Sequence, residues 1–103
     1  MTYRGSMSIG IIAKLKCAEG KNAEFEAGFK EMQKAVSKNE PGCEFYLLHK
    51  SRSDDTVYYV MEQYKDEDAL AAHGKSDAFK AAGAKLGPAS GGVPEIELMD
   101  LVS

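Results

Sequence analysis

Two histidines and two cysteines are the side chains of this sequence best suited to metal binding or nucleophilic chemistry: His49, His73, Cys17 and Cys43. Metal sites usually draw their ligands in close pairs, because one stretch of backbone then holds both. Here the histidines lie in separate segments, and neither an H-x-x-x-H nor a C-x-x-C spacing occurs. We therefore predict no metal site. Two cysteines in an acidic chain of cytosolic type do not form a disulfide framework either, so we predict no bond between them.

A glycine-rich segment near the carboxyl end is a second place to look for chemistry. Residues 87–94 read G-P-A-S-G-G-V-P. A phosphate-binding loop opens a helix and is followed by Lys-Ser or Lys-Thr. This segment instead precedes an alternating stretch typical of a strand, so we interpret it as a flexible linker.

Composition narrows the classes of function further. The chain has 103 residues, a net charge of −3 and no cluster of lysines and arginines. Nucleic acid is therefore not an expected partner, because phosphate binding needs concentrated positive charge. No apolar run approaches the roughly 20 residues that span a bilayer, so we expect a cytoplasmic protein without membrane association. Residues 1–7 carry no pattern, and we treat them as a leader or a cloning remnant before a single domain over residues 8–103.

Hydrophobic spacing predicts four strands and two helical segments. Phe25, Phe29, Met32 and Val36 recur on one face of a helix. A second helical segment begins after Asp66, a good N-cap residue, and can be capped again at Ser76. The predicted strands cover residues 8–15, 43–50, 57–64 and 95–102, and the helical segments cover residues 21–39 and 67–86. The order β-α-β-β-α-β is that of an α+β, ferredoxin-like domain, in which a right-handed crossover makes the first two strands parallel.

The central hairpin predicts a sheet with two apolar faces. If Lys50 pairs with Val57, one face carries Phe45, Leu47, His49, Tyr58, Val60, Glu62 and Tyr64, and the other carries Tyr46, Leu48, Tyr59 and Met61. Two helices cover only one face, and an open apolar face of this width exceeds the patches usual on monomers. Hiding roughly several hundred Å² on each partner, at ~25 cal/mol per Å², stabilises a dimer by several kcal/mol. We therefore expect a homodimer that pairs through its sheet faces.

Two longer motifs carry a resemblance to a known family. They are E-P-G-C-E-F-Y-L-L-H at residues 40–49 and M-E-Q-Y-K-D-E-D-A-L-A-A-H-G-K-S-D-A-F-K-A-A-G-A-K-L at residues 61–86. E-P-G-C precedes the second strand, Glu62-x-Tyr64 closes the third strand, and D-E-x-A-L-x-x-H is followed by S-x-x-F. In these features the chain resembles the antibiotic biosynthesis monooxygenase superfamily, in particular its quinol monooxygenase branch, over residues 8–102. The resemblance implies a dimeric α+β barrel.

The resemblance also implies a reaction, because enzymes of this family oxygenate phenols or quinols with O₂ and use no metal, flavin or other prosthetic group. Such a reaction needs a buried base that deprotonates the phenol, and an apolar pocket that excludes water and holds a small aromatic substrate. His73 is the candidate base, because imidazole titrates near neutral pH. Glu62 is a second candidate catalytic residue, which would orient or polarise a donor. The candidate substrate-binding residues are Tyr64, Tyr58, Phe45 and His49.

Each of these side chains also has a purely structural interpretation. His73 beside Leu70 could be a packing histidine, Glu62 could cap the following helix or pair with a lysine, and the tyrosines could be sheet core. The chain also departs from its relatives, which often carry His where Ala78 stands and Trp where Tyr64 stands. Haem-degrading relatives use a Trp and an Asn on the first strand. This chain has no Trp, and its first strand has no Asn, so haem degradation is not expected.

Two other functions remain open at this point. A branch that isomerises a small phosphorylated dione during quorum-signal breakdown has a similar helix start, Y-K-D-E-D-A, here residues 64–69. Its anionic substrate would need lysines near the pocket, and Lys50, Lys65 and Lys75 are available. The third possibility is a dimer that keeps the fold as a non-catalytic binding or stress-associated protein.

Overall fold

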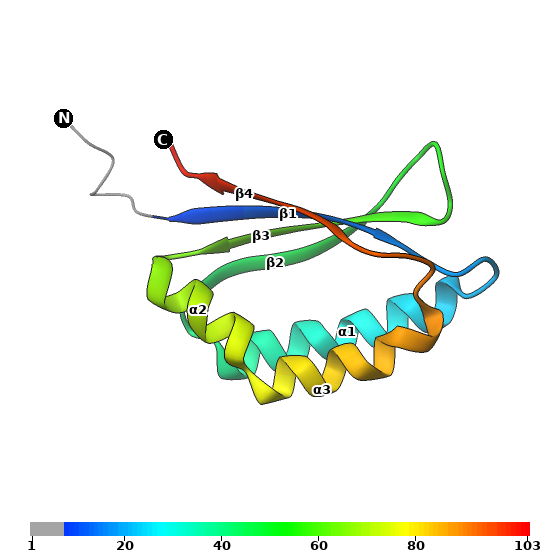
Figure 1. Cartoon of the computed structure of the whole chain (residues 1–103), viewed down its shortest axis with the longest axis horizontal. Coiled ribbons are helices and arrows are strands. Elements are labelled where there is room, and N and C mark those ends of the chain that lie inside the picture. The colour runs from blue at the N-terminus through cyan, green and yellow to red at the C-terminus, as the bar shows by residue number, and fades with distance from the viewer. Residues whose placement is uncertain (1–7) are drawn as a thin grey trace.

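The computed structural model describes residues 8–103 as a four-stranded sheet with helices on one face (Figure 1). Its elements in chain order are β1 (Ile9–Lys16), α1 (Asn22–Asn39), β2 (Cys43–Lys50), β3 (Val57–Tyr64), α2 (Glu67–Lys75), α3 (Asp77–Leu86), a short 3₁₀ helix (Gly87–Ala89) and β4 (Glu95–Asp100). The predicted order of strands and helices is confirmed, with small shifts at the element ends. The predicted leader, residues 1–7, lies outside the described residues.

The sheet has the strand order β2-β3-β1-β4, and each pair of neighbouring strands is antiparallel. β1 and β2 run parallel to each other with β3 between them, as the right-handed crossover through α1 requires. Side chains of α1 and α3 pack beneath the sheet and share one core with those of the strands. This core includes Ala13, Phe25, Phe29, Met32, Val36, Tyr46, Tyr58, Val60, Ala82 and Leu86.

The second helical segment forms two helices, because its sequence supplies two N-caps. Asp66 accepts a hydrogen bond from the backbone N–H of Ala69 at 2.8 Å, and Ser76 accepts one from that of Phe79 at 3.1 Å. Ser76 has an extended backbone, which ends α2 and begins α3. After this break α3 runs beside α1, whereas α2 stays near the end of the sheet (Figure 1).

The segment predicted as a flexible linker, residues 87–94, is ordered in its first part, and the prediction was wrong there. Gly87–Ala89 form a 3₁₀ helix, the side chain of Ala89 is buried, and Ser90 forms an isolated antiparallel bridge with Cys17. This pairing depends on a segment far away in the sequence, so local composition does not reveal it.

The predicted pairing of β2 with β3 was wrong by one residue along most of the hairpin. Lys50 pairs with Tyr58 and not with Val57. The reason is the turn, where the N–H of Ser51 donates to the carbonyl oxygen of Val57 at 2.9 Å and closes a shorter loop. A β-bulge near the start of β2 then restores the predicted register beyond it.

The corrected register exchanges the two faces of β2. Tyr46 and Leu48 share the helix-covered face with Tyr58, Val60 and Glu62, whereas Phe45, Leu47 and His49 share the open face with Tyr59, Met61 and Gln63. The side chains expected at the pocket and those expected on the open face are therefore interchanged on this strand.

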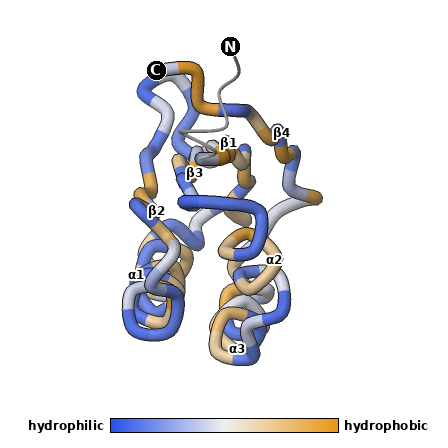
Figure 2. Tube along the Cα trace, turned by 90° about the vertical axis from the view of Figure 1, so that its left-hand side faces the viewer, coloured by the Kyte–Doolittle hydropathy of each residue, from blue (hydrophilic) through white to orange (hydrophobic). Residues whose placement is uncertain are grey.

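The open face of the sheet is apolar at its centre. Leu47, Met61 and Ile12 lie next to one another across β2, β3 and β1. Leu47 is 50% exposed and Met61 is 42% exposed. All three labelled helices lie on the other side of the sheet (Figure 2). This arrangement agrees with the expectation of two apolar faces, of which the helices cover one.

Both cysteines are free thiols, which confirms the prediction that they do not pair. Cys17 follows β1 and Cys43 begins β2, so they lie at opposite ends of two parallel strands. Among residues 8–103, no helix combines the length and the apolar character needed to cross a membrane.

The E-P-G-C motif meets α2 at a close contact between Gly42 and Ala69. A Cβ atom on Gly42 would lie 2.5 Å from the Cβ of Ala69. The backbone N–H of Lys65 also donates to the carbonyl oxygen of Gly42 at 2.9 Å, which ties the loop to the end of β3. Only glycine leaves room for this approach, and the contact determines where α2 lies relative to the loop before β2.

Gly42→Ala is expected to destabilise the protein by about 1–3 kcal/mol, because either the loop or α2 must move to admit the methyl group. The matched control is Gly74→Ala, since no atom lies within 4 Å of a Cβ placed there. In helix α2 that substitution should stabilise by about 0.5–1 kcal/mol. Denaturant unfolding at one protein concentration measures both changes. Equal stability of Gly42→Ala and the parent protein would show that the contact is loose.

Candidate functional site

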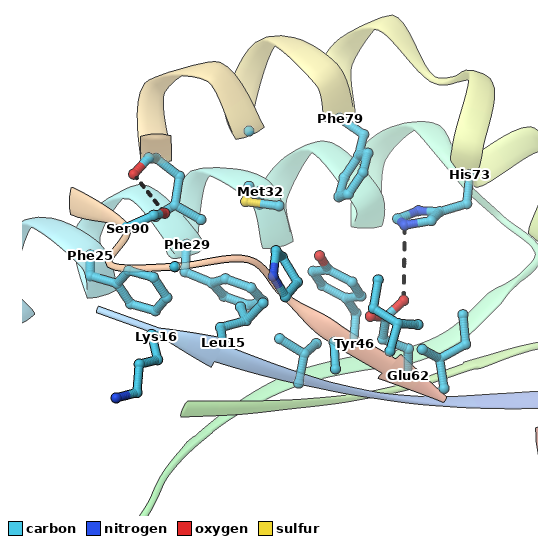
Figure 3. A pocket seen from close by; sticks show the side chains of 18 residues that line it. Leu15, Lys16, Phe25, Phe29, Met32, Tyr46, Glu62, His73, Phe79 and Ser90 are labelled. Atoms are coloured by element: carbon cyan, nitrogen blue, oxygen red, sulfur yellow. Dashed lines mark hydrogen bonds and ion pairs between the residues drawn. The ribbon is translucent and has the colours of Figure 1, made fainter. Parts of the chain in front are cut away.

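A cavity of about 420 Å³ lies between the sheet and the helix layer (Figure 3). Its wall is mostly apolar and aromatic, and Phe25, Phe29, Met32, Tyr46, Phe79 and Leu86 contribute to it. Polar side chains are concentrated at its two ends, with His73 and Glu62 at one and Lys16 and Ser90 at the other. The amino group of Lys16 points away from the other lining side chains (Figure 3). The volume falls within the range typical of small-molecule sites.

The end of the cavity that holds His73 and Glu62 is its polar end. There the imidazole of His73 lies between two buried carboxyl groups. Its Nδ1 is 2.7 Å from Oε1 of Glu40, and its Nε2 is 3.9 Å from Oε1 of Glu62. Helix α2 supplies the histidine, the E-P-G-C motif supplies Glu40, and β3 supplies Glu62. The ring also packs against Phe79 and Tyr64, with centroids 4.1 and 5.0 Å away. Three segments that are distant in sequence thus converge on one imidazole.

Glu62 changes its protonation state near neutral pH. Burial raises its pKa from 4.5 to about 7, and the negative charge of Glu40 acts in the same direction. The hydroxyl of Tyr64 donates to Oε1 of Glu62 at 2.9 Å and partly opposes this shift. Burial and the charge of Glu62 raise the pKa of Tyr64 well above its ordinary value, so this phenol stays protonated as a donor.

Tyr46 places a second phenol at the cavity. Its ring stacks on Phe29, with centroids 5.3 Å apart and planes inclined by 6°. Burial, and then the charges of Glu62 and Glu40, raise the pKa of Tyr46 far above its ordinary value. Its hydroxyl stays protonated and makes no side-chain hydrogen bond to any other residue from 8 to 103, so it is free to bond to a ligand.

The structure brings together the two predicted catalytic residues, His73 and Glu62, at the cavity. It places Tyr64, predicted to bind substrate, behind Glu62, where the tyrosine is fully buried and holds that carboxyl group. The sequence analysis put these three residues at one site, but it did not anticipate that Tyr64 would act on Glu62.

The other three predicted substrate-binding residues do not line the cavity. Phe45 and His49 lie on the open face, as a consequence of the corrected register. Tyr58 faces the helices but is buried in the core, where it stacks on Phe25 with centroids 4.7 Å apart. Its hydroxyl donates to Glu26 at 2.6 Å, and burial raises the pKa of this phenol to about 12. Tyr58 therefore connects β3 to α1.

Two residues of the site were missed in the sequence analysis. Tyr46 was assigned to the wrong face by the register error. Glu40 had a signal, since it opens the E-P-G-C motif, but nothing local indicated that it would contact a histidine 33 residues later. In the part of the chain that the structure describes, no group of three or more His, Cys, Asp or Glu side chains is placed to hold a metal ion.

An imidazole at the polar end of an apolar cavity can take a proton from a bound hydroxyl group. The resulting positive charge would be paired with the carboxylate of Glu40, 2.7 Å from Nδ1, which offsets the cost of burying it. The apolar wall lowers the local polarity and so strengthens these interactions. The arrangement therefore suits deprotonation of a flat, mostly apolar hydroxyl compound.

Comparisons with known proteins place this chain in a family. Among curated protein sequences, none matches it. A solved structure from Caulobacter crescentus CB15, whose description names antibiotic biosynthesis monooxygenase, is 46% identical to this chain. Its TM-score is 0.90 over 95% of this chain and 92% of that one. SnoaB of Streptomyces nogalater, described as a cofactor-independent oxygenase, is 21% identical, with a TM-score of 0.81 over 93% and 94% of the two chains.

A conserved protein from Methanosarcina mazei Go1 is 24% identical, with a TM-score of 0.84 over 97% of this chain and 98% of that one. At these lower identities the likeness concerns the fold. The sequence model described as "Antibiotic biosynthesis monooxygenase" matches residues 8–85, a span that contains Glu40, Glu62 and His73. The chain therefore belongs to the antibiotic biosynthesis monooxygenase family.

Proposed function

We propose that this protein is a cofactor-independent monooxygenase of the quinol monooxygenase branch, which oxidises a small quinol or phenol with O₂. The observation that carries the proposal is a buried histidine, His73, at the polar end of an aromatic cavity of about 420 Å³. An aromatic ring fits such a wall, and its hydroxyl would lie at the imidazole. The description of SnoaB as a cofactor-independent oxygenase supports the same chemistry.

In the proposed first step His73 acts as the general base. The substrate O–H bond breaks, the proton binds to Nε2, and the electron pair stays on the oxygen as a phenolate. Nε2 is 3.9 Å from Glu62, beyond hydrogen-bond distance, so its lone pair is available to a substrate. The hydroxyl of Tyr46, protonated for the reasons given above, can donate to the phenolate oxygen.

The phenolate is the electron-rich species that O₂ can oxidise. A quinol that gains one oxygen atom and leaves as a hydroxyquinone supplies every electron that O₂ takes up, and the second oxygen atom leaves as water. No external reductant is needed for this balance. The role of the protein is to make the anion, hold the ring and keep water out.

Glu62 would complete the polar end as a group that orients the substrate hydroxyl. Because its pKa is about 7, it can be neutral at neutral pH. A neutral carboxyl group avoids an additional buried negative charge beside the phenolate. Tyr64 would act as a positioning residue, since it holds Oε1 of Glu62.

The structure does not favour the phosphorylated dione as a substrate. Lys50, Lys65 and Lys75 are absent from the described wall of the cavity, and Lys16, the one lysine in that wall, points away. A phosphate group inside this wall would be buried without a countercharge, which is costly.

We also propose that the open sheet face binds a second copy of the chain. The central row of Leu47, Met61 and Ile12 is apolar, and Phe45 beside it is 41% exposed. The helices of the same chain lie on the opposite side (Figure 2). A two-fold axis through this face would bury the same patch on both subunits.

Oxygen uptake tests the enzymatic proposal. With menadiol as substrate, and after correction for autoxidation, the protein should accelerate O₂ uptake and place one labelled oxygen atom from ¹⁸O₂ in the product. His73→Ala should reduce the corrected rate by roughly 10²–10⁴-fold, as expected for loss of a general base. Lys38→Ala is the control, because Lys38 is exposed at the end of α1, outside the cavity wall and away from the open face, and should leave the chemistry intact. Equal rates for the two variants, or an unlabelled product, would refute the proposal.

The pH dependence of stability tests the state of Glu62. Its raised pKa means that the folded protein binds this proton more tightly than the unfolded chain does. The resulting stabilisation is full below pH 4.5 and is lost as the pH rises through about 7. Glu62→Gln removes this loss. The unfolding free energy of the variant minus that of the parent should therefore be larger above pH 7 than below pH 4.5, by on the order of 1–3 kcal/mol.

Chemical denaturation across that pH range measures the difference. The exposed residue Glu19 provides the control substitution Glu19→Gln, whose stability should follow that of the parent at each pH. A pH-independent difference between Glu62→Gln and the parent would mean that Glu62 titrates in the fold as it does in the unfolded chain.

Light scattering tests the dimer. The parent protein should have twice the 11.2 kDa mass of one subunit, and Leu47→Asp should shift it toward a single subunit, because a carboxylate would be buried against the partner. Ala27→Asp makes the same charge change on the exposed side of α1 and should leave the mass unchanged. A parent protein with the mass of one subunit would exclude pairing through this face.

A further inference from the structure

We propose that Glu40 is a positioning residue, which accepts a hydrogen bond from Nδ1–H of His73 and so fixes the imidazole in the tautomer with a free Nε2 at the cavity. The inference rests on the proposed role of His73 as the base. It assigns a function to Glu40, the first residue of the E-P-G-C motif. Glu40 itself does not line the cavity wall.

The geometry of the contact supports this assignment. Nδ1 of His73 and Oε1 of Glu40 are 2.7 Å apart, a short distance typical of charge-assisted hydrogen bonds. A carboxylate only accepts hydrogen bonds, so the shared proton belongs on Nδ1 when Glu40 is ionised. A neutral imidazole carries one ring proton, and Nε2 is then a lone-pair acceptor.

The backbone around Glu40 is held before any substrate binds. The N–H of Glu40 donates to the carbonyl oxygen of Val36 at 2.9 Å, and the carbonyl oxygen of Glu40 accepts from the N–H of Cys43 at 3.0 Å. The close contact of Gly42 with α2 fixes the distance between this loop and the helix that carries His73. The carboxylate is therefore presented by a rigid loop, and its hydrogen bond costs little additional ordering.

The partners of Glu40 argue against a merely structural ion pair. Its Oε1 has the imidazole as partner, whereas its Oε2 is buried and has no hydrogen-bond partner in the described part of the chain. Structural carboxylates in protein interiors normally satisfy both oxygens. The side-chain hydrogen bond that this buried carboxylate makes goes to the imidazole, so its charge lies beside the ring that would become positive in the reaction.

The second carboxyl group completes the arrangement. Nε2 faces Oε1 of Glu62 at 3.9 Å, so the imidazole has an acidic group near each nitrogen but a hydrogen bond at only one. The proton from a substrate hydroxyl would bind to Nε2, and the imidazolium would then lie between Glu40 and Glu62. Glu40 therefore determines which nitrogen reacts, whereas Glu62 lies on the side where the substrate approaches.

Nitrogen-15 NMR of histidine-labelled protein tests the tautomer without any assay of activity. Under mildly alkaline conditions, where an ordinary imidazole is neutral, His73 of the parent protein should show a protonated Nδ1 and an unprotonated Nε2. His49 is the internal reference, since it is exposed. A parent spectrum with the proton of His73 on Nε2 would overturn the inference, whatever the activity of the protein.

Glu40→Gln provides the sharper variant, because the amide of glutamine can rotate and donate its N–H to Nδ1. That donation moves the ring proton to Nε2 and removes the base from the cavity. We expect the NMR signature of His73 to change to the Nε2–H tautomer or to a mixture. We also expect kcat for menadiol to fall by roughly 10²–10⁴-fold, while KM changes little. Glu44→Gln, which removes the same charge at an exposed position of β2, should alter neither measurement.

The outcomes separate this inference from the proposed function. If His73 has the expected tautomer and Glu40→Gln changes it, but the parent protein consumes no O₂, the monooxygenase proposal fails and the positioning contact stands. If Glu40→Gln changes the tautomer and kcat is retained, the role of Glu40 in the reaction is refuted. If Glu40→Gln leaves the tautomer of His73 unchanged, Glu40 does not control the imidazole, and the inference fails.

Discussion

The sheet of this protein presents more apolar surface than its helices cover, and both the cavity and the open face follow from that shortfall. The helices bury the centre of one face, but on β4 the helix-facing side chains Ile96 and Leu98 remain 61% and 56% exposed. Large side chains of α1 and α3 pack against one another and against the strands without filling the space between the layers. Among residues 8–103 no helix lies on the other face, so in this part of the chain that face is left apolar and open (Figure 2).

The electrostatics of the site follow from where this cavity ends. His73, Glu40 and Glu62 are all buried there, in an environment where an unpaired charge is costly. The fold meets this cost by pairing Glu40 with the imidazole and by raising the pKa of Glu62 to about 7. A group of residues that balances its charge by moving protons is also a group that can exchange a proton with a bound hydroxyl compound. The same burial therefore reduces stability and creates the capacity for chemistry.

The two sequence motifs that indicated the family are connected through this site. Gly42 of E-P-G-C packs against Ala69 of α2, and Glu40 of the same motif bonds to His73, one turn further along that helix. Gly42 and Ala69 set the distance between the loop and the helix. At this distance Glu40 reaches His73. The E-P-G-C motif, which reads as a turn before a strand, therefore also supplies the carboxylate that contacts the candidate base.

Most of the fold could be predicted from the sequence, because its signals are local. The spacing of Phe25, Phe29, Met32 and Val36 fixed the buried side of α1, and all four side chains are buried. Asp66 and Ser76 cap their helices as their side-chain chemistry predicts. His73 and Glu62 were found because their types and motifs single them out, and they lie together at the cavity.

The remaining features depended on contacts that the hydrophobic pattern of the sequence does not specify. The hydrogen bond between Ser51 and Val57 and the bulge in β2 determine which side of the sheet each residue of that strand faces, so only the folded chain could place Tyr46 at the cavity and Phe45 outside it. Periodicity gives alternation along a strand but not its phase relative to a partner. The sequence by itself determined the order of the elements, their buried sides and the candidate base. Only the tertiary structure decided which carboxylate that base contacts, because such a contact depends on how separate elements pack in space.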